Sequence, residues 1–141
     1  MSGDNGKSRE MIQDFFDNMG QNGDTDALME LLSPDVIVDT PFSPKGQPIH
    51  FEGIEQVRAR FGGGRAAMKA LEFFDLEILA TEDPEKWVAT CRSEGTHVDG
   101  RSYANSYCWI FRVRDGKIVW WCEYYDPQPV MEFVDDISIE V

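Results

Sequence analysis

The amino-acid sequence predicts a single α+β domain in which helices come first and a mostly antiparallel sheet follows. Apolar side chains recur at helical intervals early in the 141-residue chain, and from Glu72 onward they alternate with a period of two. Asp-Gly pairs at Asp99 and Asp115 separate later apolar runs and are typical of tight hairpins, because both residue types tolerate positive φ. No repeat or linker divides the chain. We expect one domain over residues 9–135, a flexible tail at 1–8 and a C-terminal tail at 136–141.

Three helices are expected before the sheet. The first ends near Gly20, and its apolar face is formed by Met11, Ile12, Phe15, Phe16 and Met19. The second begins at Asp24 or Thr25 and must end by Pro34, since residues before proline avoid helical geometry. The third begins at Gly53 in "GIEQVRARF" and is interrupted by "GGGR", which we interpret as a flexible flap, before a weaker helical turn in "AAMKAL".

The predicted strands begin with a small hairpin and continue as a meander. "DVIVDTPF" and "PIHFEG" form the hairpin around the turn-rich "SPKGQ". The strand from Glu72 has one apolar face, formed by Phe74, Leu76, Ile78 and Ala80. Three further strands are bounded by "TEDPEK", "VDGR" and "RDGK". Alternation along the last strand gives two faces, one with Val119, Trp121, Glu123 and Tyr125 and the other with Trp120, Cys122 and Tyr124.

Composition argues against several classes of partner. The formal net charge of -13 would repel nucleic acid and anionic membrane surfaces, and no basic cluster offsets it. The sequence contains no membrane-spanning run and no signal peptide, so we expect a cytoplasmic protein. Three cysteines without metal-binding spacing are expected to be buried thiols; we predict no metal site and no cofactor. His50 and His97 are expected at the surface.

Glu123 is the most informative single residue. It interrupts the aromatic run "IVWWCEYYDP", where a carboxylate is costly to remove from water. One interpretation makes Glu123 the polar group of an aromatic-lined cavity and a proton donor or shuttle. In the alternative, Glu123 faces solvent or pairs with an arginine such as Arg112 or Arg92.

The order of these motifs resembles a known superfamily. A helix pair, a hairpin near "VIVDTPF", a third helix at "GIEQVR" and a sheet ending in "DGKIVWWCEYYDP" are similar to the SnoaL-like and ketosteroid-isomerase-like branch of the nuclear transport factor two superfamily. Within that branch, "GQPIHFEG", "TEDPEKWVATC" and "CEYYDP" most resemble the phenazine biosynthesis A/B family. Over nearly the whole chain, the resemblance implies a cone-shaped barrel with a deep apolar pocket, and a homodimer formed through the outer face of the sheet.

The same resemblance assigns roles to particular residues. Glu123 matches the acid/base residue of the phenazine A/B family and Asn105 matches an Asn, whereas Arg60 replaces a His and suits a substrate carboxylate. The acid, tyrosine and base of ketosteroid isomerase correspond here to Trp109, Phe16 and Thr40, which argues against steroid isomerisation by that constellation. Asp39 precedes Thr40 and is a second-rank pocket candidate.

We therefore expect a small cofactor-independent lyase, isomerase or cyclase acting by acid/base catalysis on a small apolar or aromatic substrate. The catalytic candidates are Glu123, Asn105 and Tyr107, and the substrate-binding candidates are Trp109, Arg60, Trp121, Tyr125, Phe16, Thr40 and Asp39. Tyr107 and Trp109 could equally be ordinary core aromatics. The rival hypothesis is a non-catalytic binding or oligomerisation module. A catalyst should place Glu123 beside an enclosed cavity, whereas a module should show it solvated or held by an arginine.

Overall fold

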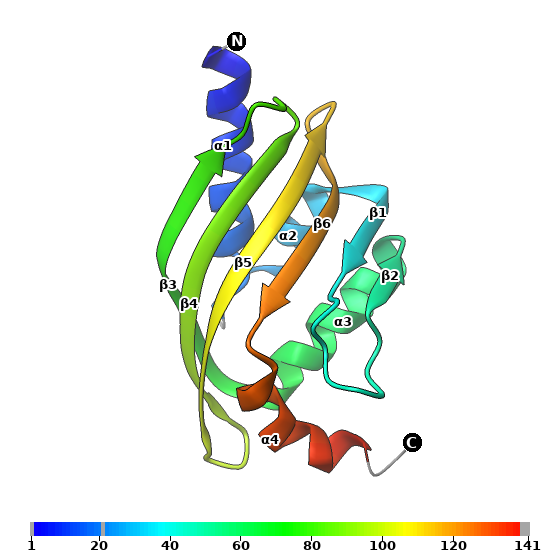
Figure 1. Cartoon of the computed structure of the whole chain (residues 1–141), viewed down its shortest axis with the longest axis vertical. Coiled ribbons are helices and arrows are strands. Elements are labelled where there is room, and N and C mark those ends of the chain that lie inside the picture. The colour runs from blue at the N-terminus through cyan, green and yellow to red at the C-terminus, as the bar shows by residue number, and fades with distance from the viewer. Residues whose placement is uncertain (1, 21, 139–141) are drawn as a thin grey trace.

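The computed structural model describes residues 2–20 and 22–138, which form a curved six-stranded sheet covered on one face by helices (Figure 1). The helices are α1 (Ser2–Asp17), α2 (Thr25–Glu30), α3 (Ile54–Ala67) and α4 (Pro127–Ser138), and the strands are β1 (Leu32–Asp39), β2 (His50–Glu52), β3 (Met68–Ala80), β4 (Lys86–His97), β5 (Ser102–Arg114) and β6 (Lys117–Tyr125). The predicted α+β class, with three helices before the long strands, is confirmed.

The strand order places the last strand in the middle of the sheet. The order is β2-β1-β6-β5-β4-β3, and every neighbouring pair is antiparallel except β1 and β6. The β1–β2 hairpin therefore joins the meander through a parallel contact that pairs Val38 with Trp121. As a result, Glu123 on β6 lies near the centre of the sheet rather than at an edge.

Aromatic side chains fill one end of the space between the sheet and α1. Trp87, Phe111 and Trp121 lie side by side on β4, β5 and β6, and all are at most 1% exposed. Phe15 of α1 packs edge-on against this row, with ring centroids 5.3 Å from Phe111 and 5.0 Å from Trp121. Such edge-to-face contacts add to the stability gained from burying apolar area. The apolar face predicted for the first helix is therefore the face that contacts the sheet.

Two helices extend beyond their predicted ends. α1 begins at Ser2, so residues 2–8, which we expected to form a tail, are helical; Met1 lies outside the described residues. α3 continues through "GGGR" to Ala67, and β3 starts at Met68, where a further helical turn was predicted. Glycine costs a helix only about 1 kcal/mol per residue relative to alanine. Burial of Val57 and Phe61 anchors α3 strongly enough to tolerate that cost.

The sequence also carried a signal for α4 that we did not use. Pro127 and Pro129 suggest a chain that has left regular structure, yet proline is favoured in the first helical turn, where its missing N–H is not needed. Asp126 Oδ1 accepts a hydrogen bond from the Gln128 N–H at 3.0 Å, as a helix N-cap does. The predicted C-terminal tail is helical as far as Ser138, and 139–141 lie outside the described residues.

Irregularities in two strands change which side chains face the helices. The β3–β4 register shifts between Phe74 and Glu77, and Asp75 has a φ of 57°. Phe73, rather than the predicted Phe74, therefore packs against the core, and the Arg92 guanidinium lies 4.6 Å from the Phe74 ring centroid. Strict alternation fails at such bulges because one extra residue reverses every later side chain.

A similar shift affects β6. The β5–β6 register breaks between Arg112 and Val113, and Ile118 is buried in the core where alternation predicted Val119. Beyond the shift, Trp121, Glu123 and Tyr125 face the helices as predicted. None of the described helices is both long and apolar enough to cross a membrane.

A charged cluster on the outer face of the sheet joins the hairpin to β6. Asp39 contacts His50 Nδ1 at 2.6 Å and accepts a hydrogen bond from Trp120 Nε1 at 2.9 Å, while His50 Nε2 lies 3.0 Å from Glu52. The hydrogen bond to Asp39, followed by that to Glu52, raises the pKa of His50. Burial acts to raise the pKa of Asp39, but the hydrogen bonds from His50 and Trp120 outweigh it and lower that pKa.

We predict that this cluster makes stability depend on pH. A raised His50 pKa stabilises the fold fully below the ordinary value of 6.5, and the contribution is lost as pH rises through the raised pKa. A lowered Asp39 pKa contributes above 3.8 and is lost as pH falls through the lowered pKa. His50→Gln should therefore lower Tm most between these two values. Thermal unfolding across pH, with exposed Lys45→Gln as control, tests this, and a pH-independent difference would contradict it.

Candidate functional site

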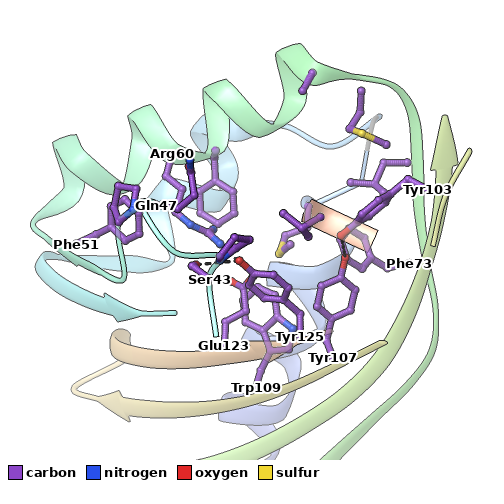
Figure 2. A pocket seen from close by; sticks show the side chains of 18 of the residues that line it. Ser43, Gln47, Phe51, Arg60, Phe73, Tyr103, Tyr107, Trp109, Glu123 and Tyr125 are labelled. Carbon is purple, nitrogen blue, oxygen red and sulfur yellow. Dashed lines mark hydrogen bonds and ion pairs between the residues drawn. The ribbon is translucent and has the colours of Figure 1, made fainter. Parts of the chain in front are cut away.

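The concave face of the sheet ends in a cavity of about 460 Å³. The turn after α1, the hairpin segment 43–51, α3, the long strands and the start of α4 all contribute to its wall (Figure 2). Cavities of roughly 300–1,000 Å³ hold small organic ligands in proteins. This pocket has a polar end beside Arg60 and Ser43, and a second side formed by Phe73 and Tyr103.

Glu123 lines this cavity and makes a single ion pair. Its exposed fraction is 5%, and its Oε2 accepts a hydrogen bond from Arg60 Nη2 at 3.0 Å. Its Oε1 is buried and has no hydrogen-bond partner among the described residues. A guanidinium is always protonated and can only donate, so Arg60 supplies a positive charge to this buried carboxyl group. A buried carboxylate held through one oxygen retains a lone pair that can accept a proton.

Arg60 extends from α3 to Glu123 and lies between two aromatic rings. The guanidinium carbon lies 5.5 Å from the Phe51 ring centroid and 5.9 Å from that of Phe61. Within the described part of the chain, its hydrogen bond to Glu123 is the only one it forms. Since a guanidinium carries five donors, most of its hydrogen-bonding capacity remains for water or a ligand.

Tyrosine hydroxyls from β5 form a second polar group on the pocket wall. The Tyr107 hydroxyl lies 2.8 Å from Ser93 Oγ and 3.4 Å from the Tyr103 hydroxyl. Burial is the main reason that the pKa values of Tyr103 and Tyr107 are raised. Both phenols therefore stay protonated, and each is a neutral hydrogen-bond donor suited to a carbonyl or enolate oxygen.

Asn105, predicted to act on the substrate, is occupied by the protein itself. Its Nδ2 donates to the Tyr103 hydroxyl at 2.8 Å and to the Asp126 carbonyl at 2.9 Å. Its Oδ1 accepts from the Asp126 N–H at 2.9 Å. Asn105 is thus a positioning residue: it orients Tyr103 and continues the β5–β6 pairing at the point where β6 leads into α4.

Thr40 likewise acts through a neighbour. It is fully buried and does not line the cavity, and its Oγ1 accepts a hydrogen bond from Ser43 at 2.9 Å. Ser43 in turn lies 2.8 Å from the Tyr125 hydroxyl. Burial is the first cause of the raised pKa of Tyr125. The hairpin therefore contributes a hydroxyl relay that ends at a pocket tyrosine.

Three predicted substrate-binding residues lie elsewhere. Phe16 and Trp121 are buried in the aromatic core and do not line the cavity. Rings of α1 pack directly against the sheet there, with Phe15 against Trp121 and Phe16 against Trp109. Asp39 is on the outer face, paired with Cys122, since it is one residue out of phase with buried Val38. The structure therefore places all three side chains outside the cavity wall.

The structure brings the remaining candidates together. The cavity is lined by Arg60, Tyr107, Trp109, Glu123 and Tyr125, as the sequence predicted. Trp109 lies directly across from Glu123 in the β5–β6 ladder, and its Nε1 is buried without a partner among the described residues. In Figure 2, Glu123, Trp109, Tyr107 and Tyr125 lie in the lower part of the pocket, and Arg60 approaches from α3 above them.

Several lining residues were missed. Tyr103 belongs to the odd-numbered series of β5, so continuing the alternation two residues back from Asn105 would have found it. Ser43 and Gln47 come from an irregular loop that carries no periodic signal. His97 was expected at the surface, but its side chain is 15% exposed, lines the cavity and lies 3.0 Å from Asp99.

The surroundings of Glu123 combine a feature expected of a catalyst with one expected of a binding module. Glu123 lies beside a ligand-sized cavity and is also held by an arginine. That arginine is Arg60, whereas Arg92 pairs with Asp75 and Arg112 with Asp83 and Glu85. No group of three or more metal-ligating side chains occurs within the part of the chain that the structure describes.

The fold and this pocket define the SnoaL-like class of small α+β cone proteins. The SnoaL-like domain family matches residues 12–121, and the chain belongs to this family. An uncharacterized PhzA/B-like protein of Pseudomonas aeruginosa is 27% identical over 119 residues, which are 84% of each chain.

Two solved structures show the same fold. A proposed isomerase from Bacillus subtilis aligns with a TM-score of 0.83 at 24% identity, covering 92% of this chain and 93% of that one. A phenazine biosynthesis-related protein from Pseudomonas aeruginosa aligns with a TM-score of 0.81 at 19% identity, covering 93% and 86%. The resemblance that we drew from the sequence is therefore confirmed, and at these identities the structures establish the fold alone.

We predict that Arg60→Met destabilises the protein by about 3 kcal/mol, because it leaves Glu123 buried without its cation. The double variant Arg60→Met/Glu123→Gln should regain most of that loss. Arg58→Met is the matched control on the same helix: its partner Asp26 is exposed, so the change should stay within about 0.5 kcal/mol. Urea unfolding measures all three. Equal losses in the two single variants would contradict a structural role for the buried pair.

Proposed function

We propose that this protein is a cofactor-independent acid/base catalyst of the isomerase, lyase or cyclase type, acting on a small, largely apolar carbonyl compound. The observation that carries the proposal is a buried carboxylate, Glu123, that lines a ligand-sized cavity and is held through one oxygen only. A carboxylate so placed can remove a proton from carbon next to a carbonyl and return it elsewhere.

Each polar group of the pocket then has a role. Glu123 takes the proton, and the carbonyl oxygen, which gains negative charge as it does so, accepts hydrogen bonds from the hydroxyls of Tyr107 and Tyr103. These phenols are held by Ser93 and Asn105, so little reorganisation is needed during the reaction. Arg60 binds an acidic substituent where the substrate has one.

A non-catalytic binding module is the second candidate. The hydrogen bond between Arg60 and Glu123 favours it, because that contact partly satisfies the carboxylate within the protein. The names of the relatives, a proposed isomerase and a phenazine biosynthesis-related protein, agree better with catalysis. The same fold can nevertheless host either function.

Proton exchange distinguishes the two candidates without knowledge of the natural substrate. We predict that the protein accelerates deuterium incorporation from D₂O into 2-tetralone, a bicyclic ketone, measured by NMR. Glu123→Gln should slow the catalysed exchange by about a hundredfold or more. Tyr107→Phe should slow it by about tenfold or more, since Tyr103 remains as a donor.

The matched control is Tyr124→Phe, which removes a hydroxyl from the outer face of β6, the strand that carries Glu123, and should leave exchange unchanged. Exchange no faster than in buffer, or equally fast in Glu123→Gln, would favour the binding module instead.

We also propose that two copies of the chain associate through the outer face of β6. Cys122 is already buried within one chain, and Tyr124 packs against Phe42 at 5.2 Å, but Phe42 itself is 54% exposed and continues the apolar surface. Large exposed apolar patches commonly mark interfaces. Sedimentation should show a dimer at micromolar concentration and a monomer for Phe42→Lys. A monomeric wild-type protein would contradict the proposal.

A further inference from the structure

The loop between β1 and β2, residues 40–49, contacts β6 on both faces of the sheet. Phe42 packs against Tyr124 on the outer face, with ring centroids 5.2 Å apart. The next residue, Ser43, lies on the pocket side, where its Oγ is 2.8 Å from the hydroxyl of Tyr125 (Figure 2). Two consecutive residues of the loop therefore contact two consecutive residues of β6, one pair on each face.

The hydroxyl groups behind Ser43 fix the direction of its hydrogen bond with Tyr125. Thr40 Oγ1 donates its only proton to the Pro48 carbonyl at 3.3 Å, and Ser43 Oγ donates its own to Thr40 Oγ1 at 2.9 Å. Because a hydroxyl carries one proton, Ser43 can only accept from Tyr125. The phenol of Tyr125 is thus the donor that begins a chain of three hydrogen bonds ending inside the loop.

This bond is the main polar connection between the loop and the rest of the fold. The other described hydrogen bonds of the loop join its own residues, as when the Gln47 N–H donates to the Pro44 carbonyl at 3.0 Å. Among the described residues, Tyr125 supplies the only hydrogen bond between residues 41–49 and a helix or strand. The position of the loop therefore depends on its contacts with β6 and on the burial of Pro44.

The same loop belongs both to the pocket and to the outer surface. Its residues Ser43, Pro44, Gln47 and Pro48 line the cavity, whereas Phe42 is 54% exposed. Association of two copies over the outer face of β6 would fix Phe42 in one position, and ordering a mobile surface group opposes association. A loop that Tyr125 already holds from the pocket side needs less ordering, so each contact strengthens the other.

We propose that residues 41–49 couple dimer assembly to the pocket: association over Phe42 and Tyr124 holds the loop that forms part of the pocket wall, and the hydrogen bond from Tyr125 strengthens the dimer from the opposite face of the sheet. The inference rests on the proposed dimer and specifies what that dimer does to the pocket. Coupling of this kind is reciprocal. A ligand that fixes the loop therefore tightens the dimer by the same factor by which dimerisation tightens ligand binding.

Sedimentation equilibrium of pocket variants tests the coupling without a ligand. Tyr125→Phe removes only the phenol oxygen, on the face away from the interface. It should weaken the dimer about fivefold or more, since each copy loses a hydrogen bond that orders the loop. Ser43→Ala should weaken the dimer to a similar extent. The double variant should be no weaker than either single one, because all three lack the same bond.

The matched control is Tyr107→Phe, which also removes a phenol oxygen from the pocket. That hydroxyl lies 2.8 Å from Ser93 of β4 and not beside the loop, so the dimer should dissociate as the wild type does. Hydrogen exchange gives the reciprocal measurement. In wild-type protein diluted below its dimer dissociation constant, the Gln47 amide should exchange about fivefold or more faster than in concentrated protein, whereas the Trp109 amide within the sheet should not.

Three results would overturn the coupling: equal dimer dissociation constants for the wild type and Tyr125→Phe, equal weakening in Tyr107→Phe and Tyr125→Phe, or a Gln47 amide whose exchange rate is the same at every protein concentration. In each of these cases a dimer through β6 would still stand. A wild-type protein that stays monomeric would overturn the dimer and the coupling together. None of these outcomes bears on proton transfer by Glu123, so the proposals can fail separately.

Discussion

Packing of α1 against the sheet determines where the core ends and where the cavity begins. Phe15 of α1 contacts Trp109, Phe111 and Trp121 with ring centroids 5.0–5.4 Å apart, and it is fully buried. Those rings fill the space at one end of the cone. Beyond them α1 has ended, and the next covering element, α3, lies against the hairpin and the far end of the sheet (Figure 1). The cavity is the part of the cone that α1 does not reach.

The register of β5 and β6 makes the inward-facing side chains change from apolar to polar between the core and the cavity. Successive inward rows across β5 and β6 pair Phe111 with Trp121, Trp109 with Glu123, and Tyr107 with Tyr125. The rows therefore pass from purely apolar, through a row with an indole and a carboxylate, to a row of phenols. A one-residue slip of β6 would place Cys122 and Tyr124 in the pocket and Glu123 on the outer face. The hydrogen-bonded register is thus as much a part of the site as the side chains are.

Most of the fold could be predicted from the sequence, because helical spacing, two-residue alternation and the Asp-Gly turns are local signals. It also located Glu123, Tyr107, Trp109, Tyr125 and Arg60 at the pocket. Alternation grouped the first four on one face of each strand, and the resemblance identified those faces as inward and added Arg60. The sequence could not locate the bulge at Asp75, whose positive φ follows from tertiary pairing. Nor could it reveal that Asn105 binds Asp126 and that Thr40 binds Ser43, because Asp126 is distant in sequence and Ser43 lies in an irregular loop.

The position of Glu123 follows from these constraints. One row deeper, beside Trp121, a carboxylate would be sealed among rings that offer no cation, and its desolvation would have no compensation. One row further out, at Tyr125, hydroxyls already supply the polar groups. At its actual row, Glu123 is close enough to the core to be shielded from water, yet within reach of Arg60 on α3. The boundary between core and cavity is the place where a carboxylate can be both stabilised by one cation and available to a ligand.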